Sequence, residues 1–122
     1  MKLKANDIDR LVKKGFISKS EKKALDQLVT ELKRFWPGSK GKVFGSKVKG
    51  TSDEESDLDI LILLPNDVTK EIRRQIIHRA FDINLTFGTN ISTLIMSEKE
   101  WNSDLFSFLP IHSFIEEEGV PL

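Results

Sequence analysis

Two stretches of the chain carry apolar residues at the spacing of an amphipathic helix. The first begins at Ser18, where Glu21 stands three residues on and completes a capping box, and it ends before Pro37. The second spans residues 69–87 and is followed by Gly88, the residue type that most often caps a helix C-terminus. We therefore predict one helix in each stretch.

Three shorter runs have the composition of β-strands. The run KVFG at residues 42–45 is short, and the run NISTLIMS at residues 90–97 is rich in β-branched and apolar residues. Between them, residues 58–64 are apolar on both faces, except for one aspartate. A strand that is apolar on both faces is typical of the centre of a sheet covered on both sides.

A second capping box, formed by Ser97 and Glu100, follows the third strand. It predicts a helix through Trp101 and Phe108, followed by a short helical tail that ends at Glu118. The order of elements is helix, strand, strand, helix, strand, helix. This order predicts an α/β (α+β) fold in which helices pack on a small mixed sheet of three or four strands.

The composition narrows the class of protein. A chain of 122 residues suits a single domain, with an N-terminal helical segment (1–36), a sheet segment (42–97) and C-terminal helices (98–118). The 19 basic and 19 acidic residues cancel, so no overall field favours nucleic acid or an anionic membrane as a partner. There is no cysteine, which excludes disulfides and thiolate chemistry. No run is long enough for a membrane span and no signal peptide is evident, so we expect a cytoplasmic protein.

Two aspartates stand at the start of the buried central strand. Asp57 and Asp59 are two positions apart, so their side chains point to the same face and can share a divalent cation. Mg²⁺ is commonly held by one or two carboxylates together with phosphate oxygens. Gly45 allows close backbone approach, and Ser46 adds a hydroxyl beside N–H groups that can bind phosphate. A Gly-Ser dipeptide alone is common in turns, and an Asp-x-Asp pair alone is common as a cap or a solvated pair. The combination of the two at this spacing is a specific signal of a metal and phosphate site.

The order Phe44-Gly45-Ser46, ten residues, then Asp57-Leu58-Asp59 resembles the signature of a known family. The family is the minimal nucleotidyltransferase (MNT) domain of the DNA polymerase β-like nucleotidyltransferase superfamily. The resemblance covers most of the chain from about residue 25 onward. It implies the nucleotidyltransferase (polymerase β-like) fold and transfer of a nucleoside monophosphate from an NTP.

The same resemblance implies roles for individual residues. Asp57 and Asp59 would be the catalytic residues and the ligands of Mg²⁺. The nucleotide-binding residues that it implies are Gly45, Ser46, Lys47 and Ser56. Lys47 stands where the family often has arginine, and Ser56 matches a serine common before the first aspartate.

One position departs from the pattern of many active members, which carry a third carboxylate on the next strand. Here Ser92 occupies the expected position, and serine is neither a strong base nor an anionic ligand. The site could be degraded, or a partner chain could complete it. Alternatively, Asp82, Glu98 or Glu100 could supply the missing carboxylate.

Two classes of function follow. The leading one is a Mg²⁺-dependent enzyme that transfers AMP from ATP to a hydroxyl of a protein or small molecule. The resemblance further suggests the antitoxin of a HEPN/MNT toxin-antitoxin pair, with a helical HEPN-type protein as partner, or a homo-oligomer. The alternative is a catalytically weak module of the same fold that binds a nucleotide or a partner and acts by complex formation.

Overall fold

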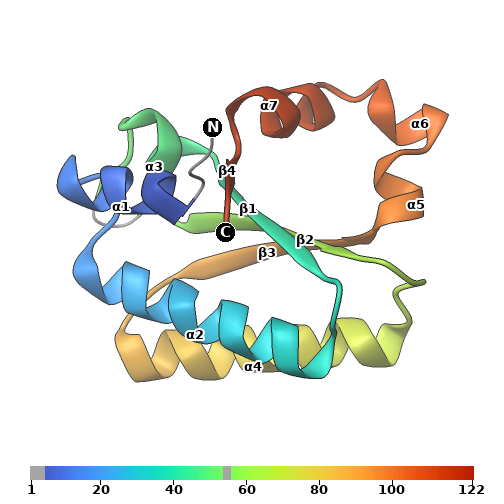
Figure 1. The fold of residues 1–122 in the computed structure, drawn as a ribbon, viewed down its shortest axis with the longest axis horizontal. Coiled ribbons are helices and arrows are strands. Elements are labelled where there is room, and N and C mark those ends of the chain that lie inside the picture. The colour runs from blue at the N-terminus through green and yellow to red at the C-terminus, as the bar shows by residue number, and fades with distance from the viewer. Residues whose placement is uncertain (1–4, 54–55) are drawn as a thin grey trace.

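The structure, a computed structural model, describes residues 5–53 and 56–122 and places a four-stranded mixed sheet between helical layers (Figure 1). The strands are β1 (Lys40–Phe44), β2 (Leu58–Leu64), β3 (Ile91–Ser97) and β4 (Val120–Pro121). The helices are α1 (Ala5–Lys13), α2 (Lys19–Phe35), α3 (Ser46–Lys49), α4 (Lys70–Phe87), α5 (Glu98–Trp101), α6 (Asp104–Ser107) and α7 (Pro110–Glu118). The strand order is β3-β2-β1-β4, with β2 and β3 parallel and the other pairs antiparallel. The predicted mixed sheet is confirmed.

Helices α2 and α4 lie side by side on one face of the sheet (Figure 1). The predicted capping box starts α2, because the Ser18 hydroxyl accepts the Glu21 N–H at 3.0 Å and the Glu21 carboxylate accepts the Ser18 N–H at 2.8 Å. Thr69 caps the start of α4, and Gly88 ends it with a φ of 66°. Both helices therefore begin and end where the sequence predicts.

The central strand β2 is buried on both faces, as its apolar composition predicts. Alternate residues of β2 join the larger core under α2 and α4, and they are Leu58, Ile60, Ile62 and Leu64. The opposite face contributes Leu61 to a smaller cluster with Trp101 and Ile115. Each buried aliphatic side chain contributes about 1.5–3 kcal/mol, so β2 is the most firmly held element of the sheet.

The C-terminal region differs from the prediction of one helix followed by a tail. The Ser97 and Glu100 capping box is confirmed, but its helix, α5, ends at Trp101. Ser103 then caps a new short helix, and Pro110 occupies the first turn of α7, where its lack of an N–H costs no hydrogen bond. The prediction of a continuous helix is therefore wrong.

Three further elements had no predicted bounds: α1, which lies within the predicted N-terminal helical segment, α3 and β4. The two residues of β4 pair with Lys42 and Val43 of β1, and they turn a three-stranded sheet into a four-stranded one. Among the helices within the described ranges, none is both long and apolar enough to cross a bilayer.

Candidate active site

The turn at Gly45 lies directly against Asp59. Phe44, the last residue of β1, is the register partner of Asp59 in β2, so the chain turns beside this carboxylate. Gly45 has φ 86° and ψ −156°, a conformation essentially limited to glycine. A Cβ added to Gly45 would come within 2.5 Å of Asp59 Oδ2. The two halves of the sequence motif therefore meet at one place.

The two aspartates form an electrostatically strained pair. Asp59 is half-buried in β2, and Asp57 is exposed directly before β2 begins. Partial burial, and in second place the negative charge of Asp57, raise the pKa of Asp59 above its ordinary value. A divalent cation would relieve both effects, since it replaces lost hydration and neutralises the repulsion. The donor set of two carboxylate groups therefore fits a hard cation such as Mg²⁺.

The described residues contain no group of three or more acidic or histidine side chains that could enclose a metal ion. Asp57 and Asp59 would thus be a partial ligand set. Mg²⁺ usually keeps several waters or substrate oxygens when protein carboxylates hold it. A site of this kind is suited to a metal that arrives together with a phosphate ligand.

Ser46 begins the short helix α3 immediately after Gly45 and is half-buried. The Gly45 carbonyl accepts the N–H groups of Val48 and Lys49 at 3.1 and 3.4 Å, which closes the turn. The N–H groups that open a helical turn have no acceptor within the helix. The start of α3 at Ser46 therefore has N–H groups that can donate to a ligand next to Asp59.

Lys47 makes a contact that the sequence did not predict. Its amine lies 3.1 Å from Glu21 Oε2, and the two side chains are only 7% and 12% exposed. The pair joins α3 to the capping box of α2, so Lys47 fixes the turn in position. Its charge is already compensated by Glu21, and the nucleotide-binding role predicted for Lys47 stays a prediction.

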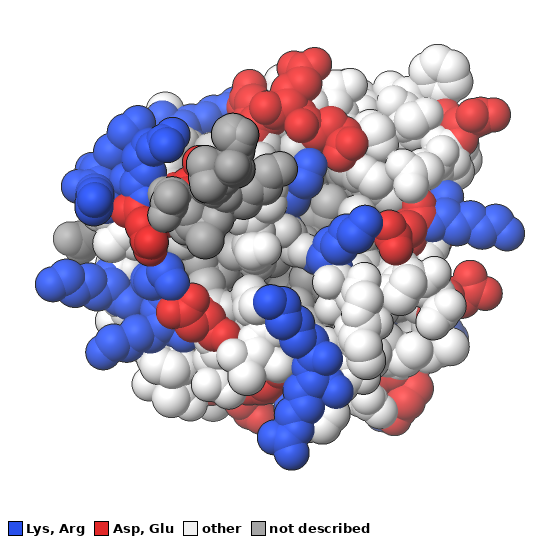
Figure 2. Space-filling view, in the orientation of Figure 1, with Lys and Arg blue, Asp and Glu red and all other residues white. Residues whose placement is uncertain are grey.

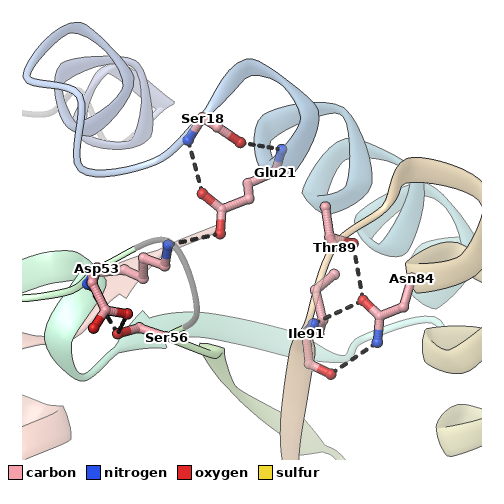
Figure 3. A network of polar contacts seen from close by, with 8 residues as sticks. Ser18, Glu21, Asp53, Ser56, Asn84, Thr89 and Ile91 are labelled. Atoms are coloured by element: carbon pink, nitrogen blue, oxygen red, sulfur yellow. Dashed lines mark hydrogen bonds and ion pairs between the residues drawn. The ribbon is translucent and has the colours of Figure 1, made fainter.

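A polar hollow of about 360 Å³ is lined by some of the predicted site residues and not by the others. Lys47 and Ser56 line it, together with Glu21 and residues 88–90, whereas neither aspartate of the motif does. The Ser56 hydroxyl accepts the Asp53 N–H at 3.1 Å and donates to the Asp53 carboxylate at 3.2 Å (Figure 3). Ser56 therefore closes the loop that leads into Asp57. Residues 54 and 55 of the motif's spacer lie outside the described residues.

Asn84 is a supporting residue that sequence reasoning missed. Its side-chain oxygen accepts the N–H of Ile91 at 2.7 Å and the hydroxyl of Thr89 at 2.9 Å, and its amide donates to the Ile91 carbonyl at 3.1 Å (Figure 3). The Leu58 N–H in turn donates to the Asn90 carbonyl at 2.9 Å. Asn84 thus holds the start of β3 next to the start of β2. An asparagine near the predicted C-terminal end of the helix was its only signal in the sequence.

Ser92 is the register partner of Asp59 across β2 and β3, as expected for the position of a third carboxylate. The three residues considered as substitutes lie elsewhere. Glu98 and Glu100 follow the far end of β3, about 16–20 Å away along the strand. Asp82 lies on the exposed side of α4, behind the opposite face of the sheet. None of them replaces the carboxylate.

Comparison with known proteins gives two matches. Residues 25–120 match the model of a family described as "Nucleotidyltransferase domain". The chain is also similar to a protein of Methanocaldococcus jannaschii named "Putative protein adenylyltransferase". The two are 34% identical over 103 residues, which cover 82% of this chain and 95% of that protein. The family match includes β1, β2 and the motif between them. The match to the relative covers most of the chain.

Proposed function

This chain belongs to the nucleotidyltransferase domain family, and from that premise we propose that it transfers AMP from Mg²⁺-ATP to a hydroxyl group of a protein. Its four-stranded mixed sheet with packed helices is consistent with the family's fold. Nucleotidyl transfer is the general reaction of the family. The nucleotide, the metal and the acceptor are the parts that we propose.

The contact between Gly45 and Asp59 carries the proposal. A triphosphate bound to the backbone at Gly45 and Ser46 would lie beside the carboxylates of Asp57 and Asp59. The acceptor oxygen would then form a bond to the α-phosphorus while the bond to the bridging oxygen breaks. Pyrophosphate would leave, and the hydroxyl proton would pass to solvent water.

Asp57 and Asp59 are the residues that we propose as ligands of Mg²⁺. The raised pKa of Asp59 supports this role, because burial and the neighbouring charge disfavour an uncompensated carboxylate there. When bound, the cation would supply positive charge to the phosphate oxygens. The chain's own part is to keep both carboxylates on one face at the end of a rigid strand.

An exposed aromatic side chain next to the Gly45 turn supports a protein acceptor. Phe114 on α7 is 55% exposed. The Lys49 amine lies 5.3 Å from the centre of the Phe114 ring, and Lys49 belongs to the turn that starts at Gly45. Acidic side chains gather along α7 (Figure 2). Aromatic side chains are enriched in protein-binding surfaces.

Ser92 favours a second candidate function. A serine in register with Asp59 leaves the site without a third anionic ligand from this strand. In that case the chain would be a weak catalyst that binds a nucleotide or a partner and acts through the complex. An antitoxin that masks a helical HEPN-type toxin by binding it would fit this description, whereas one that modifies the toxin would fit the proposed AMP transfer.

The experiment that tests the proposal is transfer of label from α-³²P-ATP in a buffer that contains Mg²⁺. The acceptor is the protein encoded by the gene next to that of this chain, where a HEPN-type partner is expected. We expect label on the acceptor with the wild type and with Asp67→Asn, an exposed aspartate beyond the other end of β2. Asp59→Asn should lose the label. If no protein transfers label while the complex still forms, the adenylylation proposal is wrong and the binding module is supported.

A further inference from the structure

The outer face of α4 carries a straight apolar stripe formed by Ile77, Phe81 and Leu85, which are 49%, 58% and 69% exposed. These residues are four positions apart, so they lie along one line of the helix. The inner face of α4 is also apolar and is buried against the sheet. A helix that is apolar on opposite sides is normally covered on both.

We propose that a second copy of this chain covers the stripe, with the two α4 helices packed antiparallel about a two-fold axis near Phe81. Ile77 and Leu85 are equally distant from Phe81 along the helix. An antiparallel pairing therefore places Ile77 against Leu85 of the second copy, and Phe81 against its own counterpart. A surface that matches itself in this way is what a two-fold interface requires.

The polar flank of the stripe is also self-complementary about this axis. His78 and Asp82 are exposed on the same side of the stripe, and their midpoint is one residue from Phe81. A two-fold axis brings this flank against the same flank of the second copy. His78 of each chain then faces Asp82 of the other chain, and the two residues of each pair are offset by about 3 Å along the helix axis. A histidine N–H can donate to that carboxylate in both pairs.

The ends of α4 supply a third match. The last turn of α4 contains no basic residue to compensate its carbonyl groups. Arg74 lies as far before Phe81 as Gly88 lies after it, so it would sit over the C-terminal end of the other helix. Its side chain is 74% exposed and pairs only with Glu71 of its own helix among the described residues. The three features are thus centred on Phe81 or one residue from it, as an antiparallel pairing of two identical helices requires.

The expected dimer is weak. One helix pair buries less than the roughly 1,200 Å² that stable interfaces begin at, so association should be reversible and dependent on concentration. A shallow hollow of about 470 Å³ beside the stripe, lined in part by His78, Arg79 and Asp82, leaves room for side chains of the other copy. Because α4 covers the sheet face opposite Asp59, both candidate active sites stay open, and the inference does not depend on the proposed function.

Cysteine cross-linking gives the sharpest test, because the chain has no cysteine of its own. Phe81→Cys lies on the proposed axis and should form a disulfide-linked dimer under mild oxidation. Leu105→Cys should not, although Leu105 on α6 is 83% exposed and Phe81 only 58%. A mixture of Ile77→Cys and Leu85→Cys chains should cross-link to each other more than either does to itself. Equal cross-linking at positions 81 and 105 would overturn the proposal.

Sedimentation velocity over a range of concentrations gives an independent readout. The wild type and Leu105→Glu should show the same monomer–dimer equilibrium, whereas Phe81→Glu should stay monomeric with unchanged circular dichroism. A wild type that is monomeric even at about millimolar concentration contradicts the inference. A dimer that survives Phe81→Glu also contradicts it, since the interface would then lie elsewhere.

Discussion

Ser92 and Asp59 are register partners across the parallel pair of β2 and β3, at the end of the sheet where Gly45 turns. Ser92 alternates along β3 with Leu94 and Met96, which pack against the same smaller cluster as Leu61. Both Ser92 and Asp59 therefore belong to the sheet face that α5 to α7 cover in part. The chain places a neutral hydroxyl where a third carboxylate would act on the same metal and phosphate.

Ser92→Asp should raise the rate of AMP transfer by the isolated chain. General-base assistance typically contributes about 10²–10⁴-fold, so even a partial effect is measurable in a label-transfer assay. Ser92→Asn is the matched control, because it has nearly the same shape and no charge, and it should not gain activity. An equal rate in all three proteins, with Mg²⁺-ATP still bound, would mean that this position does not limit catalysis.

Gly45→Ala should weaken both folding and nucleotide binding. The added Cβ would collide with the Asp59 carboxylate, and the backbone conformation is unfavourable for any residue except glycine, at about 1–3 kcal/mol. Gly15→Ala is the control, because Gly15 has a similar φ of 79° but no atom within 4 Å of an added Cβ. Chemical denaturation and Mg²⁺-ATP titration should show the larger loss for Gly45→Ala. Similar losses in both variants would argue against a functional contact with Asp59.

The raised pKa of Asp59 predicts a pH dependence in metal-free protein. The folded state holds this proton more tightly than the unfolded state, whose carboxyl titrates near 3.8. Asp59 therefore reduces stability progressively as the pH rises from about 4 toward the raised pKa of the folded state. In EDTA, Asp59→Asn should be more stable than the wild type at neutral pH, and the difference should shrink toward pH 4.

Thermal melts with and without Mg²⁺ complete this test. Mg²⁺ with ATP should raise the melting temperature of the wild type and leave that of Asp59→Asn nearly unchanged, because ligands stabilise only the state that binds them. If Asp59→Asn is less stable than the wild type at neutral pH in EDTA, the carboxylate is not strained in the way that its burial and the charge of Asp57 indicate.

Glu21→Gln should destabilise the protein through the loss of its ion pair with Lys47. Glutamine can keep the capping box with Ser18, so the change removes mainly the charge opposite a nearly buried amine. Breaking a buried pair typically costs about 3–5 kcal/mol. The control is Glu71→Gln, whose partner Arg74 is largely exposed, and the expected cost there is much smaller because solvent screens the pair. Urea denaturation of the two variants with equal losses would contradict the structural role of Lys47.

Much of the fold follows from signals that are local in the sequence. The capping boxes at Ser18 and Ser97 and the glycine at position 88 involve residues within a few positions of each other, and all three were predicted correctly. The signal for α1 is also local, since Ile8 and Leu11 have helical spacing and are buried, although we predicted no bounds for this helix. The capping serine at Ser103, which interrupts the expected long helix, was likewise present in the sequence.

What the sequence could not predict depends on contacts between distant segments. In the sequence, Lys47 is a basic residue beside a phosphate-binding motif. In the structure, its amine is nearly buried and forms an ion pair with Glu21 of α2. The strand β4 exists because the edge of β1 is open at Lys42 and Val43, and two residues carry no pattern of their own. The motif itself predicted the meeting of Gly45 and Asp59, because its residues end one strand and begin the strand that pairs with it.

Isothermal titration of Mg²⁺-ATP into the wild type and into Asp57→Asn/Asp59→Asn tests the central claim most directly. Each aspartate supplies a charged contact worth about 1.5–3 kcal/mol, so the double variant should bind on the order of a hundredfold more weakly or worse. Asp67→Asn should bind Mg²⁺-ATP with the affinity of the wild type. When ATP is titrated in EDTA, without Mg²⁺, the affinities of the wild type and the double variant should differ much less. Equal Mg²⁺-ATP affinity in the wild type and the double variant would contradict a metal–nucleotide site at Asp57 and Asp59.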